Sequence, residues 1–211
     1  TLPSNINMFV GYDQSVFVDE SISEVRFALL ISMLMVIGVI YYFLASSAAT
    51  FIPAITIPVS LISTFYVIYA LGYSLNVLTF LALVLAIGLI VDDSIVVLEN
   101  IKRRIEDGEK AFEASIEGAK QITFVVIATT LVLVAVFLPL SFMGGKTGRL
   151  FIEFGVVLSF AVIFSSIVAL TLTPMLCSKL IKNKEKIDEE PMLIRKFRKF
   201  YRESLLESQK N

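Results

Sequence analysis

The sequence contains no His, no Trp and only one Cys among its 211 residues. A lone thiol, Cys177, cannot form an internal disulfide, and without His or further Cys there is no ligand set for a zinc site. Charged residues make up 18%, below the roughly 25% of an average soluble domain, and the formal net charge is −1. These absences exclude a disulfide scaffold, a metal centre of the zinc type and the basic surface that binds nucleic acid.

Long apolar runs dominate what is present, and hydrophobic residues make up 56% of the chain. A bilayer core of about 30 Å needs about 20 apolar residues per helix. Five stretches meet that length, at about 21–44, 51–71, 75–99, 121–143 and 151–177. The sequence therefore predicts an all-α integral membrane protein with a bundle of five transmembrane helices, whose solvent is the lipid bilayer.

Three parts follow from this pattern. Residues 15–178 form the transmembrane domain. Residues 1–14 contain a short alternating pattern, in which Ile6, Met8, Val10 and Tyr12 alternate with Asn5, Asn7, Phe9 and Gly11, as in a strand. Since a lone strand is unstable, we expect residues 1–14 to end an outer domain. Residues 179–211 form a tail in which a basic, amphipathic helix at about 191–206 is expected to lie on the membrane surface; a basic linker is the alternative.

The chain has no initiator Met or signal segment, so we expect a piece of a longer protein.

The distribution of Lys and Arg predicts the orientation. Five of them lie between the third and fourth spans and ten in the tail, whereas the opposite segments hold Lys146 and Arg149, with Arg26 at the edge of the first span. Because cytoplasmic loops carry the excess of Lys and Arg, the tail is expected in the cytoplasm and Thr1 outside. A short amphipathic helix is also expected at Glu109–Ala119, on the inner surface.

Two adjacent carboxylates, Asp92 and Asp93, stand inside the third span. From Leu75 to Asp92 is 17 residues, roughly 25 Å of helix, so neither short side chain reaches water easily. The pair costs roughly 5–7 kcal/mol on insertion, against roughly 5–10 kcal/mol gained from the apolar residues of the span. A charge retained at this cost in a membrane helix indicates a functional site.

Helical geometry indicates where the pair points. At 100° per residue, Thr79, Ala82 and Ala86 lie on the same face as Asp93, and small residues mark a helix-packing face. Asp93 is therefore expected to face the bundle interior, with Asp92 on its flank. Two carboxylates this close resist joint ionisation and titrate as a coupled pair, which suits the uptake and release of protons.

Other interpretations of the pair remain. The aspartates could only lock helix packing through hydrogen bonds. An intramembrane aspartyl protease would need two aspartates on different helices, and the other spans carry none. A charge-switching pair usually has a cationic partner, yet no Lys or Arg lies at depth in any span, so that partner is expected on helices outside this sequence.

Two interpretations are open for the hydroxyl residues of the last span and for Glu153. The last span carries hydroxyls that could line a water path for protons or make packing hydrogen bonds: Ser159, Ser165, Ser166, Thr171 and Thr173. Glu153 could sense the outer vestibule, or could be a surface carboxylate near Arg149.

The run from Gly88 to Asn100, GLIVDDSIVVLEN, closely resembles the fourth transmembrane helix of resistance-nodulation-division (RND) efflux pumps of the multidrug-exporting class. Further similarity lies in Thr50–Pro53, in Phe142–Gly145 and in the run Leu172, Thr173 and Pro174. The resemblance implies the second to sixth helices of the first half of a tandem-repeat permease in the bacterial inner membrane, with the amino end periplasmic.

The resemblance also implies a function. The pump would export hydrophobic or amphiphilic compounds, driven by the proton motive force without any cofactor and without enzymatic catalysis, and Asp92 and Asp93 would carry the proton relay. Its partners would be the remaining helices and outer domains of the same pump, two further copies in a homotrimer, a periplasmic adaptor and an outer-membrane channel. A proton-coupled accessory of protein translocation and a metal-exporting relative are the alternatives.

Overall fold

Five long α-helices make up the computed structural model, which describes residues 14–44 and 46–181. They are α1 (Gln14–Leu44), α2 (Ser47–Ala70), α3 (Val77–Glu106), α4 (Ala111–Phe137) and α5 (Gly145–Leu180), with a short 3-10 helix, η1 (Leu138–Phe142), before α5. All five carry a stretch long and apolar enough to cross a membrane, which confirms the predicted all-α membrane bundle. The strand expected near the amino end and the surface helix at about 191–206 lie outside the described residues.

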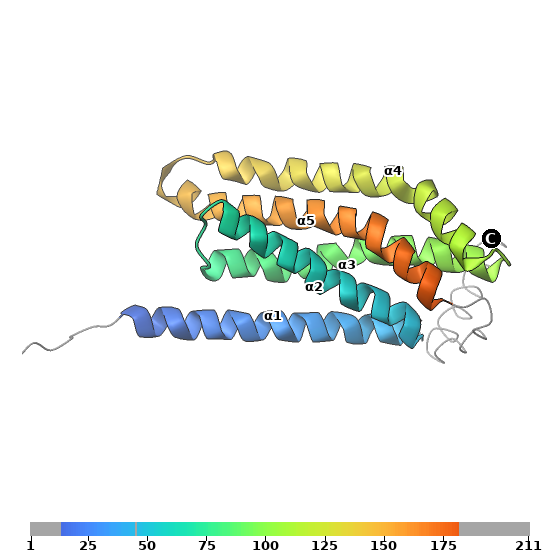
Figure 1. The fold of residues 1–211 in the computed structure, drawn as a ribbon. Helices are drawn as coiled ribbons and strands as arrows, with labels where there is room; N and C mark the ends of the chain where they lie inside the picture. Colours follow the sequence, from blue (N-terminus) through green and yellow to red (C-terminus); the bar gives the residue numbers. More distant parts are fainter. Residues whose placement is uncertain (1–13, 45, 182–211) are drawn as a thin grey trace, which may run out of the picture.

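Local sequence signals explain where the helices begin and turn. Ser46 caps α2, its hydroxyl accepting a hydrogen bond from the Ala49 amide. Asn76 caps α3 in a reciprocal capping box with Thr79. The turn between these helices contains Gly72 at φ 69°, in the left-handed region that favours glycine. Such short connections make successive helices antiparallel, so that α2 runs back along the bundle and α3 returns (Figure 1).

The bundle is built around α3 and α5, which pack on each other more extensively than any other pair of helices. More than half of the most apolar stretch of each is buried, whereas little of the corresponding stretches of α1 and α4 is buried. Figure 1 shows α1 and α4 at opposite edges of the bundle. The two edge helices therefore present broad apolar faces outside the bundle.

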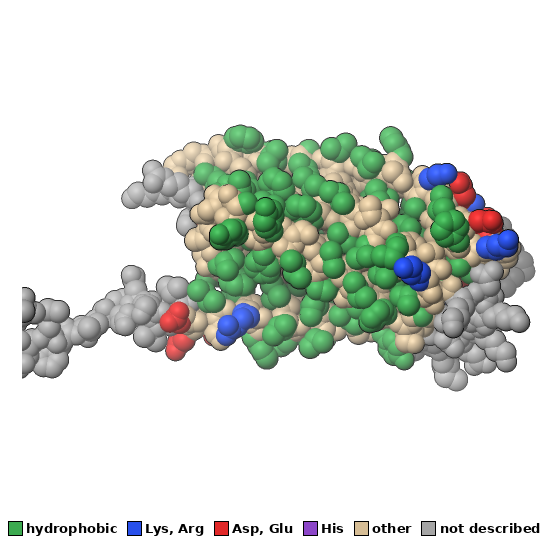
Figure 2. All heavy atoms as spheres, in the orientation of Figure 1, with side chains coloured by type: hydrophobic (Ala, Val, Ile, Leu, Met, Phe, Trp, Pro, Cys, Tyr) green, Lys and Arg blue, Asp and Glu red, His purple; other side chains and the backbone are tan. Residues whose placement is uncertain are grey.

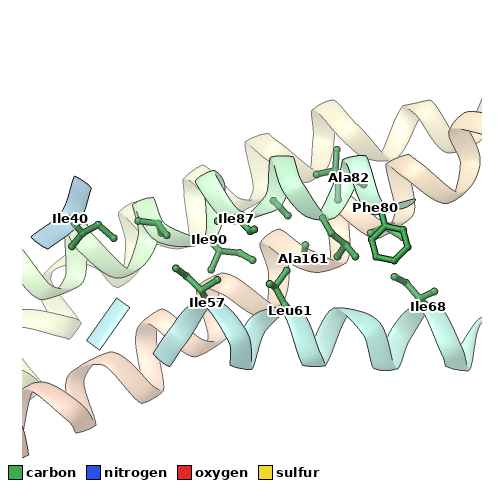
Figure 3. Close-up of a cluster of buried hydrophobic side chains, with 14 residues drawn as sticks. Ile40, Ile57, Leu61, Ile68, Phe80, Ala82, Ile87, Ile90 and Ala161 are labelled. Atoms are coloured by element: carbon green, nitrogen blue, oxygen red, sulfur yellow. The ribbon is translucent and has the colours of Figure 1, made fainter. Parts of the chain in front are cut away.

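The larger core cluster lies between α2, α3 and α5. Ile57 and Leu61 of α2 face Ile87 and Ile90 of α3, and Ala161 of α5 completes the contact (Figure 3). Ala161 is fully buried, and small residues of this kind let membrane helices approach closely. This packing fixes the rotation of α3, and with it the direction of every polar side chain on that helix.

The surface shows the division expected of a membrane bundle. Apolar side chains cover the middle of the molecule in Figure 2, and charged side chains gather toward its two ends. The end formed by the α3–α4 turn carries Lys102, Arg103 and Arg104. The middle of the bundle thus suits a hydrocarbon environment.

The segment Glu109–Ala119 differs from its prediction as a separate short helix. Residues 111–119 form the first turns of α4, which runs without a break from Ala111 to Phe137, and Glu109 and Lys110 precede the helix. Gly118 does not interrupt the helix. A Cβ atom at this position would lie 2.9 Å from Cγ1 and 3.3 Å from Cα of Ile101, so the glycine gives α4 room to lie against α3. Tertiary packing therefore offsets the low helix propensity of glycine.

Candidate functional site around the paired aspartates

Asp92 and Asp93 lie in the uninterrupted middle of α3. Fifteen residues separate Val77, the first residue of the helix, from Asp92, which places the pair roughly 22 Å along it. Thr79, Ala82 and Ala86 are fully buried, as expected for the packing face of α3. Asp93 is half-buried and Asp92 is exposed, so Asp93 faces the bundle and Asp92 lies on its flank, as the helical geometry predicts.

Asp93 has one hydrogen-bond partner on another helix. The hydroxyl Oγ of Ser165, on α5, lies 3.1 Å from Oδ2 of Asp93 and can donate to it. The same hydroxyl lies 3.1 Å from the carbonyl oxygen of Ile90, one turn earlier on α3. Ser165 is buried. The contact between α3 and α5 therefore brings a protein hydroxyl to the carboxylate.

A second polar contact lies beside the pair, on the α2 side of α3. Ser94 and Thr56 share a hydrogen bond of 3.0 Å between their hydroxyl oxygens, and both residues are buried. Thr56 also donates to the carbonyl oxygen of Pro53 at 3.0 Å. Sequence reasoning missed this pair, since both residues read as isolated hydroxyls in apolar runs. It fixes α2 against α3 next to the aspartates.

On the α4 side, the aspartates open into a groove of about 480 Å³. Its α3 wall consists of Leu89, Asp92, Asp93 and Val96. Its α4 wall is apolar apart from Thr129 and comprises Val125, Val126, Ala128, Thr129, Val132 and Leu133. Two carboxylates thus stand in an otherwise apolar groove at mid-bundle.

Among the residues that the structure describes, no Lys or Arg pairs with either of the two carboxylates. Residues 27–70, 121–142 and 154–178 contain no Asp, Glu, Lys or Arg. The ion pairs of the described residues join Lys102 to Glu106, Arg104 to Glu109, and Lys120 to Glu117, all at the far end of α3 or the start of α4. Among the described residues there is also no cluster of side chains that could hold a metal ion.

The hydroxyls of α5 divide sharply in what they contact. The hydroxyls of Ser159, Ser166 and Thr171 donate to carbonyl oxygens of α5 itself. The hydroxyl of Thr173 is buried without a hydrogen-bond partner in the described part of the chain. Ser165 is the member of this group that reaches α3. Sequence reasoning placed it among five equivalent hydroxyls, because the rotation of α5 about its own axis is set by packing.

Glu153 lies at the other end of α5, beside the α2–α3 turn. Its Oε2 accepts hydrogen bonds from Nδ2 of Asn76 at 2.6 Å and from Oγ of Ser74 at 3.4 Å. The side chain therefore ties the start of α5 to the N-terminal cap of α3, a contact that neither sequence interpretation included.

The arrangement has a clear chemical capacity. A carboxylate in an apolar groove costs less when it is protonated, and two adjacent carboxylates disfavour joint ionisation. Ser165 can stabilise an ionised Asp93 by donating its proton, and its oxygen can accept one from a protonated carboxyl. Asp93 can thus take up or release a proton while it keeps a hydrogen bond to Ser165 in each state.

Comparison with known proteins identifies relatives. The multidrug resistance protein MdtC of Pectobacterium atrosepticum is 50% identical over 182 residues, which cover 86% of this chain and 18% of that protein. The MdtC proteins of Escherichia coli O139:H28 and Klebsiella pneumoniae are 48% and 49% identical over 86% and 87% of this chain, and again over 18% of their own length. This chain therefore spans about a fifth of the length of these relatives.

A family-level comparison gives the same result over a longer stretch. The sequence profile of the AcrB/AcrD/AcrF family matches residues 1–208. A match over almost the whole sequence, together with the motif around Asp92 and Asp93, places this chain in the AcrB/AcrD/AcrF family of RND multidrug efflux permeases.

Proposed function

We propose that this chain supplies the second to sixth membrane helices of the first half of a tandem-repeat RND pump. The pump exports hydrophobic or amphiphilic compounds across the inner membrane, and proton influx through a relay that contains Asp92 and Asp93 drives the export. Asp93 is the principal carrier, and Asp92 titrates with it as a coupled pair.

The observation that carries this proposal is the environment of Asp93. Its carboxylate lies at mid-bundle, in hydrogen-bond contact with Ser165 and open to an apolar groove. A purely structural polar residue would be better satisfied by neutral partners at a lower insertion cost, as Thr56 and Ser94 are. Two carboxylates at this depth suit proton transfer instead.

The groove between α3 and α4 is the place where we expect the cationic partner of the aspartates to pack. Asp92 is exposed there, and an ionised carboxylate facing lipid would be strongly unfavourable. A helix from the second half of the pump, carrying Lys or Arg, would fill the groove and neutralise the pair. The absence of Lys and Arg at depth in these five helices supports this assignment.

Drug export is favoured over the two alternatives by the relatives. The MdtC proteins that share about half of their aligned residues with this chain are named multidrug resistance proteins. A translocation accessory or a metal exporter with the same helix arrangement would have other relatives at this level of identity. The homotrimer, the periplasmic adaptor and the outer-membrane channel remain part of the proposal.

The test is export by the full-length pump, reconstituted in vesicles with an imposed proton gradient. Asp93→Asn and Asp92→Asn should each reduce drug export and proton flux to background, because an amide cannot bind and release a proton in this pH range. Insertion should be unaffected, since removing a charge from mid-membrane lowers its cost. Glu99→Gln, which neutralises an exposed carboxylate on the same helix, is the matched control and should export normally.

The opposite result has a specific meaning. Asn retains hydrogen-bonding capacity, so a packing role would leave export nearly normal in both variants. Near-normal proton flux in Asp92→Asn and Asp93→Asn would therefore refute the relay.

A further inference from the structure

The hydroxyl of Ser165 lies between two acceptors on α3. Its Oγ is 3.1 Å from Oδ2 of Asp93 and 3.1 Å from the carbonyl oxygen of Ile90. A serine hydroxyl carries one proton, so it can fully satisfy only one of these acceptors at a time. The equal distances mean that a small rotation of the hydroxyl exchanges one acceptor for the other.

The surroundings of Asp93 leave few other groups to respond to its charge. On its own helix the neighbouring titratable group is Asp92, which lines the same groove. The α4 wall contributes Thr129 among apolar side chains. The stretches of α1, α2 and α5 at this depth contain no Asp, Glu, Lys or Arg. Among the described residues, Ser165 is thus the polar side chain from another helix that hydrogen-bonds to the Asp93 carboxylate.

We propose that Ser165 is a hydroxyl switch that links the protonation state of Asp93 to the packing of α5 against α3. The inference rests on the proposed uptake of protons by Asp93. When Asp93 is ionised, Ser165 donates to its carboxylate. When Asp93 is protonated, its O–H donates to Oγ of Ser165, and Ser165 donates in turn to the carbonyl oxygen of Ile90.

The two states differ in what holds the helices together. In the first state a charge-assisted hydrogen bond joins α5 to the Asp93 side chain, and such bonds are shorter and stronger than neutral ones. In the second state a neutral hydrogen bond from Asp93 reaches Ser165, and a further one joins Ser165 to the backbone of α3 at Ile90. Each proton taken up or released by Asp93 thus changes the strength and direction of one contact between the two central helices.

The chain offers a matched control at the next position. The hydroxyl of Ser166 is also buried, but it donates to the carbonyl oxygen of Ile163 on its own helix, at 2.9 Å. Ser165→Ala and Ser166→Ala each remove one buried oxygen from the same turn of α5. Only Ser165→Ala removes a hydrogen-bond partner of Asp93.

The experiment measures proton-driven export by the full-length pump in vesicles of fixed internal pH while the external pH is varied. Ser165→Ala should shift the alkaline limb of the profile upward by about one pH unit, a roughly tenfold change, because the ionised carboxylate loses a donor. Ser166→Ala should superimpose on the unsubstituted pump. Ser165→Cys, with a weaker donor of similar shape, should shift the limb in the same direction by less.

An infrared measurement tests the switch without transport. The carboxyl C=O band assigned by its loss in Asp93→Asn should titrate at higher pH in Ser165→Ala than in Ser166→Ala. If Ser165→Ala matches Ser166→Ala both in the pH profile of export and in the titration of this band, the switch is refuted. That result would leave the relay standing, whereas export by Asp93→Asn would refute the relay itself.

Discussion

Gly118 shows how one residue sets the distance between α3 and α4 near the end of the bundle that carries the α3–α4 turn. A Cβ atom there would meet Ile101 at 2.9 Å for Cγ1 and 3.3 Å for Cα. The close approach also allows Nδ2 of Asn100 to donate to the carbonyl oxygen of Gly118 at 2.8 Å. A larger side chain would separate the helices and lengthen this hydrogen bond.

We therefore expect Gly118→Leu to lower the free energy of unfolding by about 1–3 kcal/mol, the usual cost of overpacking. Gly38→Leu on α1 is the control, because no atom lies within 4 Å of a Cβ atom built there. Thermal unfolding of the purified protein in detergent measures both. An equal change in the two variants would contradict the role assigned to Gly118.

The direction of Asp93 could be predicted from sequence and its partner could not. The first follows from the 100° repeat of the helix and from the small residues Ala82 and Ala86, both fully buried. The second depends on how α5 is rotated against α3, which is set by the packing of residues such as Ala161. Periodicity within one helix cannot reveal that Ser165, rather than Ser166, is the residue that reaches Asp93.

At the scale of elements, the α2–α3 turn is joined to α5 by a network around Asn76. The Oδ1 atom of Asn76 accepts from the Leu78 and Thr79 amides, which caps α3. Its Nδ2 atom donates to Glu153 at 2.6 Å. The Asn76 side chain thus has two roles. A carboxylate could also cap the helix, but it could not donate a hydrogen bond to Glu153.

Asn76→Asp separates these two roles. The substituted carboxylate would still cap α3, but it would stand against Glu153 without a proton to donate. We expect a loss of about 1–3 kcal/mol in the free energy of unfolding at neutral pH, from the lost hydrogen bond and like-charge repulsion. Adding Glu153→Gln should restore most of it, since the new amide can donate to the carboxylate. Denaturant titration measures the free energy of unfolding of the single and the double variant. If Asn76→Asp alone is as stable as the unsubstituted protein, the hydrogen bond between Asn76 and Glu153 does not contribute to stability.

The elements themselves were largely predictable, because each apolar run is as long as a membrane crossing and is bounded by polar or glycine residues. The exception is the start of α4, where the amphipathic spacing of Phe112 and Ile116 suggested a separate short helix. The first turns of α4 instead pack against the bundle. Ala114 is fully buried there, in a second cluster of buried apolar residues that includes Ile101 and Val126. The contact between Glu153 and Asn76 could not be foreseen, since 77 residues separate the two positions.

At the scale of the whole molecule, the described bundle has a packed centre and two apolar edges. The exposed large side chains of α1 include Leu34, Met35 and Phe43, and those of α4 include Phe124 and Leu131. Composition alone predicted apolar spans without indicating which of them are central. We infer that α1 and α4 face lipid or the remaining helices of the pump, and that the groove beside Asp92 faces the latter.

The two ends of the bundle differ in charge, and this difference predicts its orientation in the membrane. Because successive helices are antiparallel, the α2–α3 turn and the α3–α4 turn lie at opposite ends (Figure 1). The second of these ends carries Lys102, Arg103 and Arg104. An excess of Lys and Arg marks the cytoplasmic side, so the α3–α4 turn should face the cytoplasm and the α2–α3 turn the periplasm.

Cysteine accessibility tests this orientation in the full-length pump. Leu71 and Asp107 are exposed residues at the C-terminal ends of α2 and α3, and the native Cys177 is fully buried. Cys177 should therefore add little background, and any cysteine outside this segment is replaced by serine in the pump used for labelling. A membrane-impermeant maleimide added to intact spheroplasts should label Leu71→Cys and spare Asp107→Cys, which should react only after permeabilisation. The reverse pattern would mean that the bundle inserts against its own charge asymmetry, and it would place the Lys and Arg cluster outside.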